Sequence, residues 1–537
     1  MQEYDFIVVG AGSAGCVLAN RLSADPKNRV LLLEAGNTDW NPMIRVPLMA
    51  GVLYTMPSLN WGYDTEPQMA LQQRRIHWPR GKVLGGSSAI NGMVYIRGHA
   101  RDYDTWRQLG LSGWSYADVL PYFLRSEDHF DRRDGFHGIG GPLAVRRAAL
   151  DHPLYDAFFS ACVATGLTPT SDFNGISQEG FGGHDFTIRN GRRHSAAEAF
   201  LHPARRRPNL HVSVRSQATR IRFDGRRAVG VDYISGATPA KARARREVIL
   251  AGGAVNSPQL LMVSGVGPAA QLSGLGISVV HDLAGVGENL QDHLGVFLQH
   301  ECLEPITLYS LFRPDRAVRA FVQAAVFGTG PAATIPLEGA AYIRSRPELD
   351  VPDIKCAIVP GLSLEATQAK QGRHGYQITV HQLRPESRGR IALRSADPAD
   401  KPMIDPNYLS APLDVATMTN AVKIVRRIFA QGSFERFRGA ELVPGPHIRT
   451  DAEITEWIRS AARTVFHPVG TCKMGIDAMA VVDAELKVRG CEGLRVVDAS
   501  VMPRIPSGNT NAPTIMIAEK GAAMILGEWP LTPIENP

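Results

Sequence analysis

The chain has 537 residues, of which 44% are hydrophobic and 20% are charged. This composition excludes an intrinsically disordered protein, and the length suits three or four domain-sized units. The formal charge of +6 is small for a chain of this length. Arginine runs such as 205–207 lack the interleaved aromatic residues of a nucleic-acid-binding surface, so we expect no nucleic-acid partner.

The cysteines and the N-terminus exclude other classes. Six cysteines are scattered without a CxxC pair, which predicts neither a disulfide framework nor a structural zinc site. No HExxH or EF-hand pattern is present, and we expect no metal. Neither a signal peptide nor a run of about 18 apolar residues is found. We therefore expect a cytoplasmic monomer or homodimer that could associate peripherally with the inner face of a membrane.

The first 36 residues predict a strand, a helix and a second strand. An apolar run at 6–9 leads into Gly10-x-Gly12-x-x-Gly15, and a helical pattern of apolar residues follows as far as Leu22. A second apolar run at 30–33 ends at Glu34. Such an alternation indicates a parallel sheet.

The glycine pattern predicts a dinucleotide site. Its glycines permit a tight turn, in which a pyrophosphate can approach the amides and the dipole of a helix N-terminus. Glu34 follows Gly15 by 19 residues, and its carboxylate suits a ribose diol. The pattern by itself does not separate NAD from FAD.

The pattern of apolar residues changes in the middle of the chain. We expect an extended loop with a short helix at 74–98, a helical stretch at 104–125 and a small β-meander at 209–250. Residues 297–460 alternate short strand-like runs with proline and glycine, which predicts a mostly antiparallel sheet with flanking helices.

The clearest predicted elements after residue 297 are two strands and one helix, followed by a C-terminal part whose pattern is similar to that of the N-terminus. The strands are expected at 354–359 and 376–383, and the helix at 415–431. The C-terminal part then reads as a strand at 494–497 and a helix at 511–525. Because both ends of the chain carry the strand and helix patterns of the first domain, we expect that domain to be interrupted by another.

Several long segments together resemble the glucose–methanol–choline (GMC) oxidoreductase family, with the nearest likeness to bacterial FAD-dependent alcohol and choline dehydrogenases. They occur in family order and the resemblance extends from residue 7 to residue 517. The segments are Pro79-Arg-Gly-Lys-Val-Leu-Gly-Gly-Ser-Ser-Ala-Ile-Asn-Gly-Met-Val94, Gly253-Ala-Val-Asn-Ser-Pro-Gln-Leu-Leu-Met-Val-Ser-Gly-Val-Gly267, Val286-Gly-Glu-Asn-Leu-Gln-Asp-His293, His467-Pro-Val-Gly-Thr-Cys-Lys-Met-Gly475, Leu494-Arg-Val-Val-Asp-Ala-Ser-Val-Met-Pro503 and Gly508-Asn-Thr-Asn-Ala-Pro-Thr514.

The resemblance implies an α/β fold. In it a Rossmann-like FAD-binding domain is interrupted by a substrate domain that has a mostly antiparallel β-sheet and flanking helices. We expect the FAD-binding domain to comprise residues 1–150, 193–297 and 461–537. The substrate domain is then expected to comprise residues 151–192 and 298–460.

The resemblance also implies the residues that bind FAD. Those expected at the pyrophosphate and adenosine are Gly10, Gly12, Ser13, Ala14, Gly15, Glu34, Ala35 and Ala218. Those expected at the ribityl chain and the flavin ring are Val83, Leu84, Gly86, Asn91, Gly92, Met93, Val94, Asp498, Ala499 and Asn509. Asp498 also suits a helix N-cap.

One position departs from part of the family. Some members attach FAD covalently through a histidine in the Gly-Gly-Ser-Ser segment. Ile90 stands at that position in this chain, and its side chain cannot form such a bond. We therefore expect FAD to be bound non-covalently.

The resemblance identifies His467 and Asn511 as the catalytic pair. Alcohol oxidation at a flavin removes a hydroxyl proton and passes a hydride from the carbon to the cofactor. A neutral histidine can take the proton near pH 7, and an amide N–H can stabilise the developing alkoxide. We assign His467 as general base and Asn511 as the hydrogen-bond partner of the alkoxide.

Three further residues are weaker candidates for contact with the substrate. Glu338 could face the pocket or pair with an arginine, and the structural role is slightly favoured. Val465 and Phe466 precede the base and could shape the pocket or belong to the core. His381 and Cys472 are expected to be buried structural residues.

The leading function is oxidation of a primary alcohol to an aldehyde, with electrons passed to a quinone, a dye or dioxygen. Choline is one candidate substrate, and it would need an aromatic or acidic site for its quaternary ammonium. Choline dehydrogenases that resemble this chain tend to carry Ser-Cys where Val469-Gly470 stands, which favours aliphatic, aromatic or polyether alcohols. A cyanohydrin lyase or a light-driven decarboxylase shares the fold, but Asn511 argues against both. The intact pair argues against a non-catalytic flavoprotein.

Overall fold

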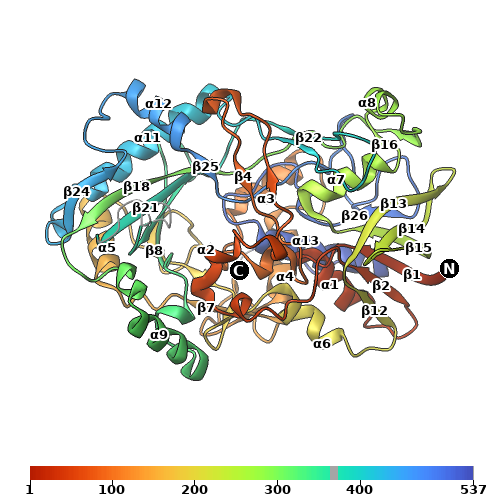
Figure 1. Ribbon diagram of the computed structural model, residues 1–537, viewed down its shortest axis with the longest axis horizontal. Helices are drawn as coiled ribbons and strands as arrows, with labels where there is room; N and C mark the ends of the chain where they lie inside the picture. Colours follow the sequence, from red (N-terminus) through yellow and green to blue (C-terminus); the bar gives the residue numbers. More distant parts are fainter. Residues whose placement is uncertain (363–372, 536) are drawn as a thin grey trace.

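The computed structural model describes residues 1–362, 373–535 and 537. Within them, the two largest sheets have seven strands each and lie at opposite ends of the molecule's long axis (Figure 1). The fold is mixed α/β, with a largely parallel first sheet and an antiparallel second sheet, as the sequence predicts.

The first sheet is built around the N-terminal strand. Its strand order is β12-β2-β1-β15-β14-β13, and β26 pairs with β15. The pairs among β12, β2, β1, β15 and β26 are parallel, whereas β13, β14 and β15 form an antiparallel meander. The bounds are β1 (Gln2–Val9), β2 (Val30–Leu33), β12 (Leu210–Ser213), β13 (Ser216–Asp224), β14 (Arg227–Ser235), β15 (Thr238–Leu250) and β26 (Leu494–Val496).

Two helices from opposite ends of the chain pack together beside this sheet. They are α1 (Ser13–Leu22) and α13 (Asn511–Leu526), and nearly all their side chains are buried. A bidentate ion pair between Arg21 and the buried Glu519 joins them, with N···O distances of 2.8 and 2.7 Å. The strand–helix–strand unit and the C-terminal helix predicted from the sequence are therefore confirmed.

The second sheet is antiparallel throughout. Its order is β24-β18-β21-β20-β19-β8, and β25 pairs with β18. Two helices, α5 (Pro153–Ala164) and α11 (Pro412–Phe429), pack against it. The bounds are β8 (Gly180–Gly183), β18 (Leu294–Cys302), β19 (Gly339–Ile343), β20 (Ile354–Val359), β21 (Gly375–Gln382), β24 (Arg438–Val443) and β25 (Arg463–Thr464).

The alternation of side chains along this sheet gives it two different faces. In β20, Cys356 and Ile358 belong to the main hydrophobic core. Lys355, Ala357 and Val359 point the other way and line a large cavity. Successive side chains of a strand point to opposite faces, so one short strand supplies both core and cavity wall.

Two predictions of local structure are wrong in detail. The predicted helix at 104–125 is two helices, α3 (Ala100–Gln108) and α4 (Tyr116–Ser126). Gly110 and Gly113 between them have positive φ angles, and Ser115 forms a capping box with Asp118 that starts α4. Residues 210–213 do not join the meander, because β12 pairs with β2 in parallel.

The other helices and strands have the following bounds. The helices are α2 (Ala50–Leu53), α6 (His202–Ala204), α7 (Gly253–Val263), α8 (Ala269–Gly274), α9 (Pro314–Phe327) and α12 (Asp451–Ala461). The strands are β3 (Tyr63–Asp64), β4 (His77–Trp78), β5 (Val94–Tyr95), β6 (Glu127–His129), β7 (Leu143–Arg147), β9 (Asp185–Phe186), β10 (Ile188–Arg189), β11 (Arg192–Arg193), β16 (Val266–Gly267), β17 (His281–Asp282), β22 (Arg390–Ala392) and β23 (Met403–Asp405). Among the described residues, no helix combines the length and the apolarity needed to cross a bilayer.

Candidate active site

A cavity of about 1060 Å³ is lined by residues of both sheets. This volume lies just above the usual range of small-molecule and cofactor sites. Most of the residues singled out from the sequence line it: Gly10, Gly12, Ser13, Ala14, Glu34, Ala35, Gly86, Ile90, Asn91, Gly92, Met93, Val94, Ala218, Val465, Phe466, His467, Asp498, Ala499, Asn509 and Asn511.

Four of the singled-out residues do not line the cavity. Gly15 lies behind the first turn of α1, where an added Cβ would be 1.8 Å from the carbonyl oxygen of Gly10. Val83 and Leu84 are fully buried. Glu338 uses its carboxylate to accept hydrogen bonds from the backbone N–H of Leu150 (2.9 Å) and the hydroxyl of Thr334 (2.6 Å).

The N-terminus of α1 forms a cradle at one end of the cavity. Its N-cap is Gly12, no side chain caps it, and no acidic residue lies in the first turn. The free amides of this ten-residue helix therefore remain available to an anion. A Cβ on Gly12 would have no protein atom nearer than 4.0 Å, so the glycine leaves space on the side of the cavity.

Glu34 lies beside this cradle with its carboxylate fixed by the backbone. Its Oε2 accepts from the amide of Ala11 (2.9 Å) and its Oε1 accepts from the amide of Gly36 (2.8 Å). Burial raises the pKa of Glu34 to about 7, although both amides and the charge of Lys82 oppose the rise. The carboxylate is thus oriented and desolvated, as the binding of a diol requires.

Asp498 is saturated by protein donors. It accepts from the amide of Gly253 (2.8 Å) and the hydroxyl of Ser257 (2.5 Å) with one oxygen. The other oxygen accepts from the amide and the hydroxyl of Ser500 (2.8 and 2.5 Å). It is the N-cap of the short 3₁₀ helix at 499–501, so the capping role suggested by the sequence is confirmed.

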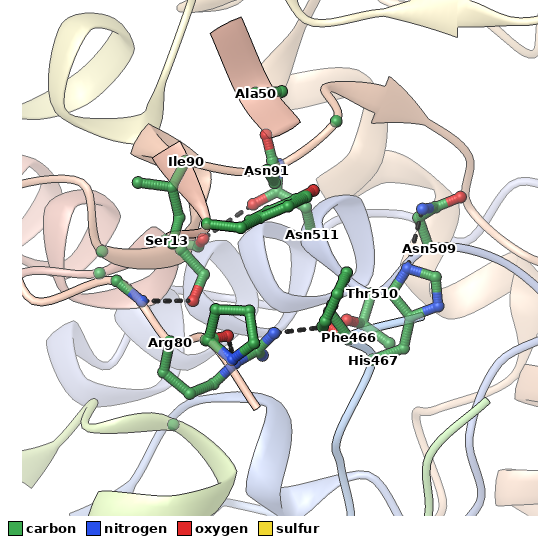
Figure 2. A pocket seen from close by; sticks show the side chains of 18 of the residues that line it. Ser13, Ala50, Arg80, Ile90, Asn91, Phe466, His467, Asn509, Thr510 and Asn511 are labelled. Atoms are coloured by element: carbon green, nitrogen blue, oxygen red, sulfur yellow. Dashed lines mark hydrogen bonds between the residues drawn. The ribbon is translucent and has the colours of Figure 1, made fainter. Parts of the chain in front are cut away.

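His467 is held by a buried aspartate and by a constrained backbone. Asp292 accepts from the backbone N–H of His467 (2.7 Å) and from the hydroxyl of Thr464 (2.5 Å). Phe466, directly before the histidine, has a φ of +70°, a conformation that is costly for a bulky residue. Arg80 donates to the carbonyl of Phe466 (2.8 Å), as Figure 2 shows. These contacts fix where the imidazole points.

A second histidine determines which nitrogen of His467 carries the proton. The Nε2 of His293 lies 3.0 Å from the carbonyl oxygen of Leu383, which can only accept. Nδ1 of a neutral His293 is therefore an acceptor, and it lies 3.0 Å from Nδ1 of His467. His467 then carries its hydrogen on Nδ1, which leaves the lone pair of Nε2 as the basic site.

The surroundings keep His467 uncharged. Burial, followed by the neighbouring His293, His381, Lys355 and Arg80, lowers the pKa of His467 well below its usual value. The imidazole is therefore neutral at pH 7 and able to accept a proton.

The amide nearest to this base belongs to Asn509. Its Nδ2 donates to Nε2 of His467 at 2.8 Å (Figure 2). Asn511 lines the same cavity, but its Oδ1 accepts from the hydroxyl of Ser13 at 2.8 Å. Of the two amides singled out from the Gly508–Thr514 segment, the structure brings Asn509 to the histidine and Asn511 to the cradle of α1.

Three residues of this site were not assigned roles from the sequence. Asp292 and His293 are the last two residues of the segment Val286–His293. The sequence shows this motif, but it does not show what these two residues do. Lys355 lies in the wall of the cavity and donates from Nζ to Oδ1 of Asn509 at 3.0 Å. Its signal was a single lysine within an otherwise apolar strand, where charge is unusual.

Comparison with known proteins identifies the family. Two family models, both described as GMC oxidoreductase, match residues 4–295 and 385–518. An oxygen-dependent choline dehydrogenase of Brucella melitensis is 48% identical over 531 residues, which cover 98% of this chain and 96% of the relative. The mitochondrial choline dehydrogenase of Homo sapiens is 48% identical over 537 residues, covering 98% and 90%.

Solved structures agree with the family assignment. A pyridoxine 4-oxidase from Mesorbium loti superimposes with a TM-score of 0.89 and 33% identity, over 98% of this chain and all of that one. A variant of the formate oxidase of Aspergillus oryzae superimposes with a TM-score of 0.92 and 26% identity, over 98% of both chains.

The observed cavity fits the cofactor of this family. The uncapped N-terminus of α1 suits a pyrophosphate, and Glu34 suits a ribose. The same cavity is lined by Gly12 and Glu34 and by His467, so its residues would hold an extended dinucleotide. The chain belongs to the GMC oxidoreductases and is an FAD-dependent oxidoreductase that acts on CH–OH groups.

Proposed function

We propose that the protein oxidises a primary alcohol to an aldehyde and that His467 removes the hydroxyl proton. The observation that supports this most is the direction of the hydrogen bonds around His467, which leaves Nε2 as an unprotonated acceptor inside the cavity. A neutral imidazole in a fixed orientation is the arrangement that general base catalysis requires.

FAD supplies the hydride acceptor when it is bound. The protein binds the alcohol, orients its hydroxyl toward Nε2 of His467, and excludes water from the cavity. The alcohol loses two electrons and two hydrogens: the hydroxyl proton goes to Nε2, and the hydride leaves from the carbon. Asp292 and His293 act through His467, because they fix its position and its tautomer.

Asn511 is our candidate for the donor that stabilises the alkoxide, and Asn509 is the second candidate. The motif supports Asn511, whereas the contact with Nε2 of His467 supports Asn509. An amide donor at a developing oxyanion contributes about 10²- to 10³-fold in rate. Asn511→Ala and Asn509→Ala are therefore to be compared by the rate of flavin reduction, and the donor is the residue whose loss costs this factor.

Choline is the second candidate substrate. The relatives from Brucella and Homo sapiens are named choline dehydrogenases, and they match 98% of this chain at 48% identity. The acceptor is dioxygen or another electron acceptor, and a quinone or a dye remains a proposal from the sequence. The domain boundaries, the cytoplasmic location, the contact with a membrane and the oligomeric state also stay predictions.

Product analysis tests the reaction. The holoenzyme is incubated with a panel of primary alcohols and choline, with either dioxygen or a dye as acceptor, and the aldehyde is identified by mass spectrometry. We expect an aldehyde in stoichiometric amount with the acceptor reduced. Decay of a cyanohydrin, or light-dependent release of carbon dioxide from a fatty acid, without alcohol oxidation would instead support a lyase or a decarboxylase.

We further predict that FAD is bound without a covalent link. Ile90 is an apolar side chain that lines the cavity and is 2% exposed, and it offers no atom for attachment. Denaturation by acid should therefore release all of the yellow colour into the supernatant. A flavin that remains with the precipitated protein would contradict this prediction.

A further inference from the structure

A buried cation lies next to the proposed base, on the side of the cavity formed by the second sheet. Lys355 is 4% exposed and projects from β20 into the cavity. Its ammonium contacts the face of Tyr342, with Nζ 5.5 Å from the ring centroid. A single amide, that of Asn509, separates it from His467.

Among the residues that the structure describes, Lys355 has no anionic partner. Among the described residues, its one hydrogen bond is to Oδ1 of Asn509, and it forms no ion pair. An ammonium has three donors, so two of them are unused. Buried charges in proteins are normally paired, because an isolated charge in a low-dielectric interior is costly. An unpaired lysine beside a catalytic base thus points to a partner that arrives with the substrate.

Two histidines beside Lys355 each have one ring nitrogen without a partner among the described residues. The Nε2 atoms of His184 and His381 are buried without a hydrogen bond among the described residues, and both residues line the cavity. Nδ1 of His184 lies 2.7 Å from the carbonyl oxygen of Leu337, so the neutral ring donates there and its Nε2 is an acceptor. His381 is therefore the histidine of the two that can donate to an anionic ligand. The charge of Lys355 contributes to the low pKa of each, so the three side chains lie within electrostatic reach of one another. Unsatisfied buried polar atoms that gather at a cavity wall suit a polar ligand.

No carboxylate of a described residue lines this side of the cavity. The acidic side chains among the described lining residues are Glu34 and Asp498, which follow strands β2 and β26 of the first sheet. Both are occupied by backbone and hydroxyl donors. Two further cations line the cavity in the described part of the chain, Arg80 and Arg463. A quaternary ammonium next to His467 would meet a cation there.

We propose that Lys355, with His381 beside it, is a subsite for a carboxylate on the alcohol substrate, so that the enzyme prefers hydroxy acids to choline. This inference rests on the proposed alcohol oxidation and names the class of alcohol. Lys355 then selects the substrate, because a bound carboxylate supplies the counter-ion and the hydrogen-bond acceptors that the folded protein lacks.

The charge of Lys355 gives the subsite a pH dependence. Burial lowers the pKa of Lys355 to about 7. The titratable groups that face it are His184, His293, His381 and His467, whose pKa values are all depressed, and Tyr342, whose pKa is raised. These groups stay neutral between pH 6 and 8, and so does its neighbour Cys356, whose pKa is raised to about 12. Carboxylate binding should therefore weaken as the pH rises through about 7, when the ammonium loses its proton.

Binding of an unreactive carboxylate tests the subsite without requiring turnover. The FAD-loaded enzyme is titrated with butanoate and with the neutral butanamide, and binding is followed by calorimetry and by the flavin difference spectrum. We expect butanoate to bind more tightly than butanamide. Lys355→Met should weaken butanoate binding about tenfold to a hundredfold, because it removes a charged hydrogen bond, and Lys355→Arg should retain most of it.

A matched control separates the subsite from general damage. Lys520 is also a buried lysine, 5% exposed and in contact with the rings of Trp114 and Tyr122, but it does not line the cavity. Lys520→Met should leave the affinity for butanoate unchanged. The flavin content and the melting temperature of each variant report whether it is folded.

Substrate selectivity provides a second test of the subsite. Flavin reduction is compared among ω-hydroxy acids from glycolate to 6-hydroxyhexanoate, the matched diols, and choline. We expect one hydroxy acid to exceed its diol and choline by at least about tenfold in kcat/KM, and Lys355→Met to remove this preference. Equal binding of butanoate and butanamide, an unchanged affinity in Lys355→Met, or a preference for choline would overturn the subsite. A failure of every alcohol to reduce the flavin would instead contradict the proposed function.

Discussion

Replacement of His467 by alanine should lower the rate of anaerobic flavin reduction by about 10²- to 10⁴-fold. The variant loses the acceptor for the hydroxyl proton, while Asp292 still binds the backbone N–H at position 467. Binding of FAD should persist, because the pyrophosphate cradle lies on α1. Stopped-flow absorbance of the oxidised-flavin band measures the effect.

Two controls connect this loss to proton transfer. His77→Ala removes a histidine whose side chain is 53% exposed and should have no effect. Added imidazole should partly restore the rate of His467→Ala, since a small base can enter the space left by the side chain. A rate within about threefold of the wild type would mean that another group takes the proton.

The pH dependence of flavin reduction gives a further test of His467 as the base. The pKa of His467 lies well below its ordinary value because of burial and the surrounding histidines and cations. As the pH falls, the base becomes protonated and inactive only below that depressed pKa. The rate of flavin reduction with a neutral alcohol should therefore stay level as the pH is lowered through 6.5.

Replacement of Gly12 by valine should abolish FAD binding in a folded protein. A Cβ at this position has room in the protein itself, since its nearest neighbour would be the Cα of Gly86 at 4.0 Å. The added side chain would instead occupy the space where a pyrophosphate approaches the amides of α1. We expect at least a hundredfold weaker binding, equivalent to about 2.8 kcal/mol.

A control glycine makes this result specific. Gly274 ends α8, and an added Cβ there would meet no atom within 4 Å. Gly274→Val should purify with the normal yellow colour, whereas Gly12→Val should purify colourless with an unchanged circular dichroism spectrum. Gly15→Ala is less informative, because its Cβ would collide with Gly10 and displace α1. Normal flavin content in Gly12→Val would place the pyrophosphate elsewhere.

The sequence predicts the fold best where local patterns are strong. Residues 2–34 form the expected strand, helix and strand, because the glycine turn and two short apolar runs leave few alternatives. The apolar periodicity continues across Gly110 and Gly113, so it predicts one helix where the structure has α3 and α4. The parallel pairing of β12 with β2 joins residues about 180 apart, and an alternating pattern alone does not specify the partner strand.

The residues of the candidate site are also predicted only as far as local motifs reach, because the motifs do not specify contacts between distant segments. The motifs point to His467 and to the segment of Asn509 and Asn511, but they do not say which amide reaches the histidine. Lys355 belongs to a different sheet and a region of weak pattern, so only the three-dimensional arrangement brings it to Asn509. Glu338 is a candidate from the sequence that the fold places outside the cavity, where its carboxylate accepts hydrogen bonds from Leu150 and Thr334.

Anaerobic titration of the holoenzyme with primary alcohols is the most direct test of the central claim. We expect at least one alcohol to bleach the oxidised-flavin band without oxygen, with release of one aldehyde per flavin. In His467→Ala the bleaching should be at least a hundredfold slower. Readmission of air then shows whether dioxygen accepts the electrons. A bound flavin that no primary alcohol reduces, across a panel of neutral, anionic and quaternary ammonium alcohols, would contradict it.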